Sequence, residues 1–206
     1  MKVCGYFFDV FPDFLCYYAK VIRGIDEKEL ARLCSERNIE AENELYTRYA
    51  ASLLTLCRRY TGSIDDAKDL MQDSIITALD KISTYTYTGT GSLYAWISRI
   101  AVNAALNRIK RNRFIPLDTG LLRKAAEPDS AVDEDLELFT QEALLEMISS
   151  LPKVQRAVFN MYCLDGFSHK EIAGELGISE RGSSGLLAKA RTNLRLKLAE
   201  YLKKHK

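Results

Sequence analysis

The segment 168–179 constrains the fold most, because it encodes the start and stop of one helix and the start of another. Ser168 followed three residues later by Glu171 is the capping-box pattern that opens a helix. Gly177 supplies the positive φ that a sharp helix end needs, and Ser179 is a suitable N-cap for the next helix. The spacing predicts a helix-turn-helix, the motif that places its second helix in the major groove of duplex DNA.

The helix predicted after this turn is basic. From Leu186 to Lys206 it contains Lys and Arg throughout and a single acid, Glu200. Positive charge beside a helix-turn-helix is typical of phosphate contact. An amphipathic, solvated helix at the end of a bundle is the alternative. The residues expected to contact duplex DNA are Ser168, His169, Lys170, Ser179, Glu180, Arg181, Ser183, Ser184, Lys189 and Arg191.

The net charge of +1 conceals a strong segregation of charge along the chain. Residues 91–113 include basic side chains and no acid, whereas residues 127–146 include acids and no base. This pattern of two basic surfaces separated by an acidic connector matters more than the net charge of the whole chain.

Apolar residues recur at helical spacing over most of the chain, and no long period-two pattern is present. Helices are expected from Asp26 to Leu33 and over 40–60, 63–82 and 92–111, with a polar loop over 83–91. Pro116, Gly120 and Pro128 indicate a linker. We therefore predict an all-α fold of two small helical domains joined by a flexible linker, with the helix-turn-helix in the C-terminal domain. The expected segments are an extension at 1–25, a domain at 26–113, a linker at 114–134 and a domain at 135–206.

The N-terminal segment 1–25 is rich in aromatic residues, but Asp9 and Asp13 interrupt it. It lacks the uninterrupted apolar run and the cleavage site of a signal peptide, and it fits a membrane span poorly. We expect no stable membrane insertion. A poorly ordered extension, a misassigned translation start and an aromatic segment packed on the body remain open.

Five widely spaced cysteines and two histidines do not form a metal-binding or disulfide pattern. Reduced thiols are expected, with Cys34 and Cys57 in the core. No cofactor, no metal ion and no catalytic residue are predicted, because no nucleophile–base pair or phosphate-binding Gly loop is visible.

Acidic side chains recur on one face of the helix predicted over 63–82. Asp66, Asp69 and Asp73 lie three and four residues apart, beside Gln72, with Leu70 and Ile76 available for apolar contact. Such a face suits a basic partner, although taken alone it is more typical of a solvated surface.

Aromatic and basic residues alternate around the next helix. Rings can stack on unpaired bases, cations can hold phosphates, and amides can read base edges. A core tryptophan with a solvated basic helix end explains the pattern about equally well. The residues expected to contact single-stranded DNA are Tyr85, Tyr87, Trp96, Arg99, Asn103, Asn107, Arg108, Lys110 and Arg111.

Taken in order, these modules resemble the extracytoplasmic-function (ECF) group of bacterial RNA polymerase sigma factors. The acidic segment is similar to the family's core-binding helix, Asp-Ala-Glu-Asp-Leu-x-Gln-Glu, and here reads Asp66-Ala67-Lys68-Asp69-Leu70-Met71-Gln72-Asp73. The aromatic helix is similar to the promoter-melting helix, Trp-Leu-x-x-Ile-Ala-x-Asn, and here reads Trp96-Ile97-Ser98-Arg99-Ile100-Ala101-Val102-Asn103. The segments 151–159 and 171–179 resemble the promoter-binding domain, so the resemblance covers Asp26 to Leu202.

The resemblance implies a function for each module. The residues expected to bind core RNA polymerase are Asp66, Asp69, Leu70, Gln72, Asp73 and Ile76. The loop and helix around Trp96 would capture unpaired promoter bases, and the helix-turn-helix would read the upstream element. It further implies an anti-sigma partner, a cytoplasmic location and no enzymatic activity of the chain's own.

Two positions depart from the family pattern. Gly182 and Gly185 stand where the recognition helix usually has side chains, and each costs a helix about 1 kcal/mol relative to Ala. Lys68 replaces a usual Glu. We expect altered specificity rather than a different class. A stand-alone helix-turn-helix regulator remains the alternative, and an enzyme would require turnover without added polymerase.

Overall fold

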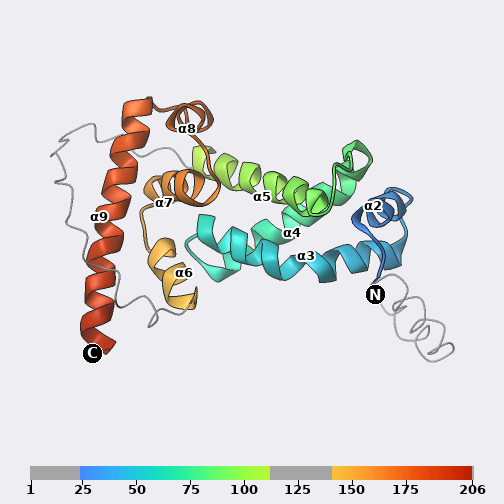
Figure 1. Cartoon of the computed structure of the whole chain (residues 1–206), viewed down its shortest axis with the longest axis horizontal. Coiled ribbons are helices and arrows are strands. Elements are labelled where there is room, and N and C mark those ends of the chain that lie inside the picture. Colours follow the sequence, from blue (N-terminus) through green and yellow to red (C-terminus); the bar gives the residue numbers. More distant parts are fainter. Residues whose placement is uncertain (1–23, 112–140, 206) are drawn as a thin grey trace. The chain divides into compact units, whose positions relative to one another are not determined.

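The computed structural model describes residues 24–111 and 141–205, and every regular element within these two ranges is a helix (Figure 1). The predicted all-α fold is thereby confirmed for the described residues. The predicted linker 114–134 and residues 1–23 lie outside them. The elements are α2 Glu27–Ser35, α3 Ile39–Tyr60, α4 Ile64–Lys81, the 3₁₀ helix η1 Ile82–Thr84, α5 Ser92–Arg111, α6 Gln141–Ser149, α7 Lys153–Phe159, the π-helix η3 Asn160–Leu164, α8 His169–Leu176 and α9 Glu180–His205.

The chain forms two compact units, and neither is a continuous stretch of sequence. One unit comprises Met1–Leu54 and Met71–Ala101, and the other comprises Thr55–Leu70 and Val102–Lys206. Helices α3, α4 and α5 therefore contribute residues to both units. The predicted domain boundaries at 113 and 135 stay a prediction.

The first unit is built from α2 and parts of the three long helices. Leu30, Leu45, Leu53, Leu93 and Ile97 are fully buried there. Helix α2 packs against η1. Apolar residues recur at helical spacing along α3 and all are buried: Leu45, Tyr49 and Leu53 in this unit, and Leu56 and Tyr60 in the second.

In the second unit, α6, α7 and α8 pack along the long helix α9 (Figure 1). Val158, Met161, Ile172 and Leu176 are buried at no more than 1% exposure, and Leu187 joins them from α9. The first half of α9 thus buries Leu187 and Ala190, and it exposes the basic residues Lys189 and Arg191.

A polar cluster in the second unit joins the end of α3 to η3 and the residue that follows it. The Tyr60 hydroxyl donates a hydrogen bond to the Asp165 carboxylate, and Arg59 forms an ion pair with the same carboxylate at 3.3 Å. The side-chain amide of Asn160 donates to the carbonyl of Arg59. Burial, followed by the charge of Asp165, raises the pKa of Tyr60. The phenol consequently remains a neutral donor to the carboxylate.

The predicted helix-turn-helix is present, and the residues predicted to start and end its helices do so. Ser168 and Glu171 form a complete capping box at the start of α8. Gly177 ends α8 in the left-handed conformation, with φ 62° and ψ 43°. The Ser179 hydroxyl accepts a hydrogen bond from the amide of Gly182 at 3.0 Å and so caps α9. These local interactions fix the turn between the two helices.

Two of the cysteines are core residues, as the sequence predicts. Cys34 and Cys57 are fully buried, and burial raises their thiol pKa to about 11 and about 12. Cys163 is exposed. Within residues 24–111 and 141–205, no helix has the length and apolar character that a membrane span requires.

Candidate nucleic-acid interface

Helix α5 presents a row of polar side chains at four-residue intervals. Arg99, Asn103, Asn107 and Arg111 are all exposed, and this spacing puts them on one face of the helix. The opposite face is apolar and buried, with Ile97, Ala101 and Ala105 among its residues. A row of guanidinium and amide groups along one exposed face can contact phosphates and base edges together.

Trp96 and Tyr85 lie against each other at the loop end of this helix. Their ring centroids are 5.5 Å apart with an interplanar angle of 54°. Both rings are half-buried, whereas Tyr87 is exposed. The Tyr85 hydroxyl is 2.6 Å from the Ser92 hydroxyl in the first turn of α5. The loop is therefore tied to the helix, and its aromatic rings border an open surface.

A cavity of about 430 Å³ lies beside this loop in the first unit. Tyr85 and Tyr87 line it from the loop, and Lys28 and Arg32 line it from α2. Arg32 is held by Glu29 and Glu36 in exposed ion pairs. The cavity therefore combines aromatic rings with cationic side chains, a combination suited to nucleotides.

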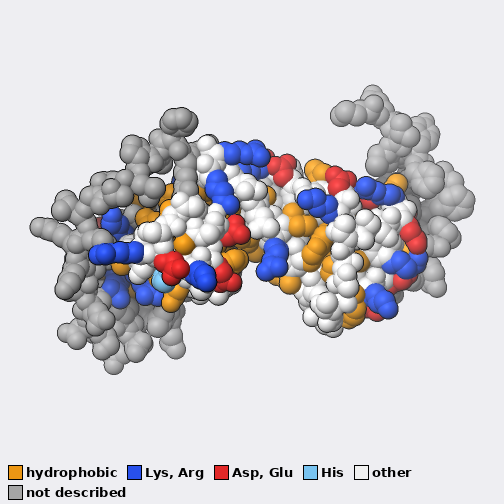
Figure 2. All heavy atoms as spheres, turned by 90° about the horizontal axis from the view of Figure 1, so that it is seen from above, with side chains coloured by type: hydrophobic (Ala, Val, Ile, Leu, Met, Phe, Trp, Pro, Cys, Tyr) orange, Lys and Arg blue, Asp and Glu red, His pale blue; other side chains and the backbone are white. Residues whose placement is uncertain are grey.

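Most of the residues predicted to contact duplex DNA are exposed. Lys170, Arg181, Ser184, Lys189 and Arg191 lie open to solvent on α8 and α9. Figure 2 shows that, on the face it presents, Lys and Arg side chains are interspersed with Asp and Glu rather than gathered in one continuous patch. The exposed basic and polar side chains of α8 and α9 are therefore the candidate residues for duplex contact.

Ser183 is a correction to the predicted duplex-binding set. Its side chain is fully buried, and its hydroxyl lies 2.9 Å from Nδ1 of His169. This bond joins α9 to the first residue of α8. Because the hydroxyl faces the interior of the motif, Ser183 stabilises the packing of α9 on α8 and is not exposed for contact with a base.

Three other members of that set also have structural roles. The hydroxyls of Ser168 and Ser179 are occupied in the helix caps. His169 is half-buried and stacks on Tyr162, with ring centroids 4.4 Å apart. The guanidinium of Arg191, a further member of the set, lies over the same Tyr162 ring, 5.9 Å from its centroid. Tyr162 was missed by the sequence reasoning, because nothing local distinguishes it from a core tyrosine.

The acidic face of α4 is exposed as predicted. Asp66, Asp69, Gln72, Asp73 and Ile76 are all open to solvent, and Ile76 keeps 59% of its surface exposed. An exposed isoleucine among carboxylates lets this face offer both apolar area and negative charge. The acidic residues and Ile76 thus occupy one side of a single helix.

Leu70 is a second correction. It was expected to offer apolar contact to a partner, but its side chain is fully buried. Position 70 lies between the exposed positions and faces inward with Ala67 and Ser74, which are also buried. Leu70 thus stabilises the fold beneath the acidic face and does not form part of its surface.

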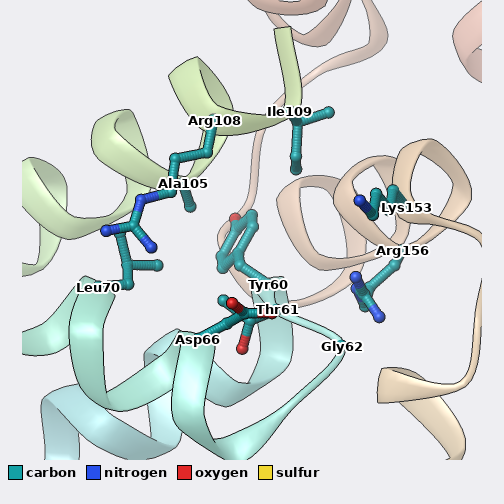
Figure 3. Close-up of a pocket in the computed structure, with 10 residues that line it drawn as sticks. All are labelled: Tyr60, Thr61, Gly62, Asp66, Leu70, Ala105, Arg108, Ile109, Lys153 and Arg156. Atoms are coloured by element: carbon teal, nitrogen blue, oxygen red, sulfur yellow. The ribbon is translucent and has the colours of Figure 1, made fainter. Parts of the chain in front are cut away.

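Asp66 lines a cavity of about 120 Å³ in the second unit, together with Arg156, Lys153 and Gly62 (Figure 3). The Arg156 guanidinium is buried at 3% exposure and donates to the carbonyl of Ser149. Burial lowers the Arg156 pKa, and the charge of Asp66 acts in the opposite direction. The basic and acidic groups at this cavity therefore partly balance each other.

Two members of the predicted single-strand set have protein neighbours in the second unit. Lys110 forms an exposed ion pair with Glu175 at 3.3 Å. Arg108 is half-buried and lines the same cavity as Asp66. An exposed ion pair contributes little free energy, so the Lys110 contact does not prevent exchange for a phosphate. No cluster of His, Cys, Asp and Glu suited to a metal ion occurs among the described residues.

Two families match the sequence, and together they cover all three groups of candidate residues. The family described as Sigma-70 region 2 matches residues 45–115, and the family described as Sigma-70, region 4 matches residues 141–194. The first range includes the acidic face of α4 and the polar row of α5. The second includes the helix-turn-helix.

Curated relatives give the same result. The ECF RNA polymerase sigma factor SigG of Mycobacterium tuberculosis is 30% identical over 170 residues, which cover 71% of this chain and 45% of SigG. The ECF RNA polymerase sigma-E factor of Salmonella typhimurium is 30% identical over 148 residues, which cover 65% of this chain and 74% of that protein. The chain thus spans about half the length of SigG. A solved structure of CnrH in complex with the cytosolic domain of CnrY is 23% identical with a TM-score of 0.43, covering 84% of this chain and 97% of that one.

Proposed function

Because the chain belongs to the ECF family of RNA polymerase sigma factors, we propose that it binds core RNA polymerase, recognises promoter DNA and assists the melting of that DNA. The observation that best supports this function is the joint exposure of two helix faces that differ in chemistry. One is the acidic face of α4 with Ile76, and the other is the polar row of α5 that begins beside Trp96.

The acidic face of α4 is proposed to bind a basic surface of core polymerase. Asp66, Asp69 and Asp73 supply negative charge, which steers association and selects the partner. Ile76 supplies apolar area that only a matching surface can bury. Gln72 adds a hydrogen-bonding group between them.

Promoter melting is proposed to rely on the loop around Tyr85 and on the exposed face of α5. Unpairing a base costs a few kcal/mol, and stacking a base on an aromatic side chain returns about 1–3 kcal/mol. Trp96, Tyr85 and Tyr87 offer rings at the start of α5, and Arg99 and Asn103 follow on its exposed face. Two or three captured bases would therefore offset the cost of opening a short stretch.

The helix-turn-helix is proposed to read a second promoter element as duplex. Lys170, Arg181, Ser184 and Lys189 are exposed near the start of α8 and in the first half of α9. Arg181 and Ser184 are closest to the N-terminus of α9, the end that enters the major groove in this motif. Gly182 and Gly185 reduce the number of side chains available there, so we expect few direct base contacts.

In this proposal the chain supplies binding and performs no bond chemistry of its own. Core polymerase would carry out nucleotide transfer. An anti-sigma factor is a further proposed partner, because the family resemblance implies one. The proposed activity places the protein in the cytoplasm, with the chromosome and the polymerase.

The experiment that tests this function measures binding to core polymerase freed of other sigma factors. The wild-type chain should form a stable complex, and Asp69→Lys should lower its affinity at least about tenfold, as expected for a charge reversal in a complementary interface. Glu29→Lys reverses an exposed acid on α2 and serves as the matched control. Tight binding of duplex DNA by the chain alone, with no polymerase complex, would instead identify a stand-alone regulator.

A further inference from the structure

Glu27, at the start of α2, contacts the start of α5 even though 66 residues separate it from Leu93. One carboxylate oxygen accepts a hydrogen bond from the amide of Leu93 at 3.2 Å. The other accepts from the hydroxyl of Tyr49 on α3 at 3.0 Å. All three residues belong to the first unit, and both donors come from buried residues.

Helix α5 has no side chain of its own for this role. The amide of Ala95 donates to the carbonyl of Gly91, so Gly91 occupies the N-cap position and has no side chain to offer. The first turn of α5 also contains no acid. The first amides of a helix lack partners within the helix, and a negative charge at this end is favourable. The Glu27 carboxylate therefore supplies both a hydrogen bond and a charge that the α5 segment itself lacks.

The same turn of α5 holds the aromatic loop. The Ser92 hydroxyl, next to Leu93, is 2.6 Å from the Tyr85 hydroxyl and also accepts from the amide of Thr88 at 3.4 Å. Tyr85 in turn lies against Trp96. A displacement of the first turn would thus move Ser92, and with it the ring of Tyr85.

A stacking contact reinforces this arrangement. The Tyr49 ring stacks on the Tyr94 ring, with centroids 5.9 Å apart and an interplanar angle of 29°. Glu27 is thus bonded to the tyrosine that packs on α5, and it is bonded to α5 itself. At the other side, Arg48 donates to the carbonyl of Ile25 at 3.2 Å, which attaches the start of α2 to α3.

We infer that Glu27 is a positioning residue for promoter melting: by capping α5 from another helix, it holds the loop of Tyr85 in the geometry that receives unpaired bases. This inference rests on the proposed function of that loop. Glu27 does not touch DNA in this account. It acts through Leu93, Ser92 and Tyr85.

Glu27→Ala tests the inference, with Glu27→Gln as the rescuing variant. Alanine removes both contacts. Glutamine keeps an acceptor for the Leu93 amide, and its NH₂ group can donate to the Tyr49 oxygen, so the geometry is retained. Glu40→Ala, which removes an exposed acid from the first turn of α3, is the matched control.

The first readout is promoter opening, which is detected by the permanganate reactivity of unpaired thymines. It is measured at a temperature where every variant is folded. For the same amount of polymerase complex, Glu27→Ala should open about fivefold less promoter, which corresponds to roughly 1 kcal/mol. Glu27→Gln should stay within about twofold of the wild type by the same conversion. The control Glu40→Ala should open as much promoter as the wild type does. Equal opening by wild type and Glu27→Ala would overturn the inference while leaving the proposed function intact.

The second readout needs neither DNA nor polymerase. Trp96 is the only tryptophan in the chain, so its emission reports on the packing against Tyr85. Glu27→Ala should shift this emission, and Ser92→Ala should shift it in the same direction, because both break the same connection. An unchanged emission in both variants would contradict the inference. Absence of opening by the wild-type complex would instead contradict the proposed function itself.

Discussion

Helices α8 and α5 begin in opposite ways. At α8, Ser168 and Glu171 cap the helix from within three residues, and both partners are exposed. At α5, the N-cap position is Gly91, and the cap comes from Glu27 on a different helix. The first start is a property of a short stretch of sequence, whereas the second is a property of the tertiary fold.

The contrast corresponds to two different tasks in the proposed function. A duplex reader needs a rigid motif that docks as a unit, and local caps provide it. A melting element must present rings in a fixed geometry to bases that have left the stack. Its supporting contacts come from α2 and α3, so its geometry depends on the whole first unit.

The largest expected effect is on the distant cap. Glu27→Ala leaves the Leu93 amide and the Tyr49 hydroxyl, both in buried residues, without their partner. Each unsatisfied buried donor costs about 1–3 kcal/mol, so we expect a loss of about 3 kcal/mol in unfolding free energy. Urea denaturation, monitored by Trp96 fluorescence, measures the unfolding free energy of the first unit, to which Trp96 belongs. If Glu27→Ala lost no more unfolding free energy than the replacement of a local N-cap does, the contrast between the two helix starts would not hold.

A local cap should cost less. Ser168→Ala removes the hydroxyl that accepts from the Glu171 amide, and N-cap replacements of this kind cost about 1 kcal/mol. Amide hydrogen exchange within α8 measures the change in local opening free energy. If exchange rises equally in α5, the two helix starts are not independent.

Two adjacent serines sharpen the distinction between support and recognition. Ser183 is buried against His169, and Ser184 is exposed. Ser183→Ala should lower the stability of the motif by about 0.5–1.5 kcal/mol. Ser184→Ala should leave stability within about 0.5 kcal/mol and weaken duplex binding.

Thermal unfolding and duplex-binding isotherms, measured on the same two samples, separate these effects. Ser183→Ala should bind duplex DNA as the wild type does at temperatures where it is folded. The reverse pattern, with Ser184 governing stability and Ser183 governing binding, would refute the assignment.

The smallest expected effect is a dependence of α8 on acidity. The backbone amide and then the hydroxyl of Ser168 donate to the Glu171 carboxylate and lower its pKa. A carboxyl whose pKa is lowered on folding stabilises the fold above its unfolded pKa, and this contribution disappears as the pH falls through the folded pKa.

Amide exchange in α8 should therefore quicken as the pH falls below the ordinary glutamate range, after correction for intrinsic exchange. Glu171→Gln retains an acceptor without a titrating proton, so it should lose this component of the pH response. An identical response in the variant would assign the effect to other acids.

The same contrast explains which parts of the fold the sequence predicts. The caps at Ser168 and Ser179 and the turn at Gly177 depend on neighbours within four residues, and each is found in the structure. Helical period also predicts the exposed faces of α4 and α5. These features are local, so a single sequence suffices.

Features that depend on tertiary packing were not predicted. Leu70 and Ser183 belong to predicted binding faces by position, yet both point into the fold. Tyr162 and Glu27 have no local signal in the sequence. Tyr162 stacks on His169, which lies beyond a turn, and Glu27 bonds to Leu93, which is 66 residues away. Only the three-dimensional fold shows which of several similar residues makes such a contact.

Reconstituted transcription tests the central claim most directly. The purified chain is mixed with sigma-free core polymerase from its own source and with a library of genomic promoters, and run-off transcripts are sequenced. We predict transcripts that start at a defined set of promoters and that decline when Asp66 and Asp73 are both reversed to lysine. Transcripts no more specific than those of core polymerase alone would contradict the assignment of this chain as an initiation factor.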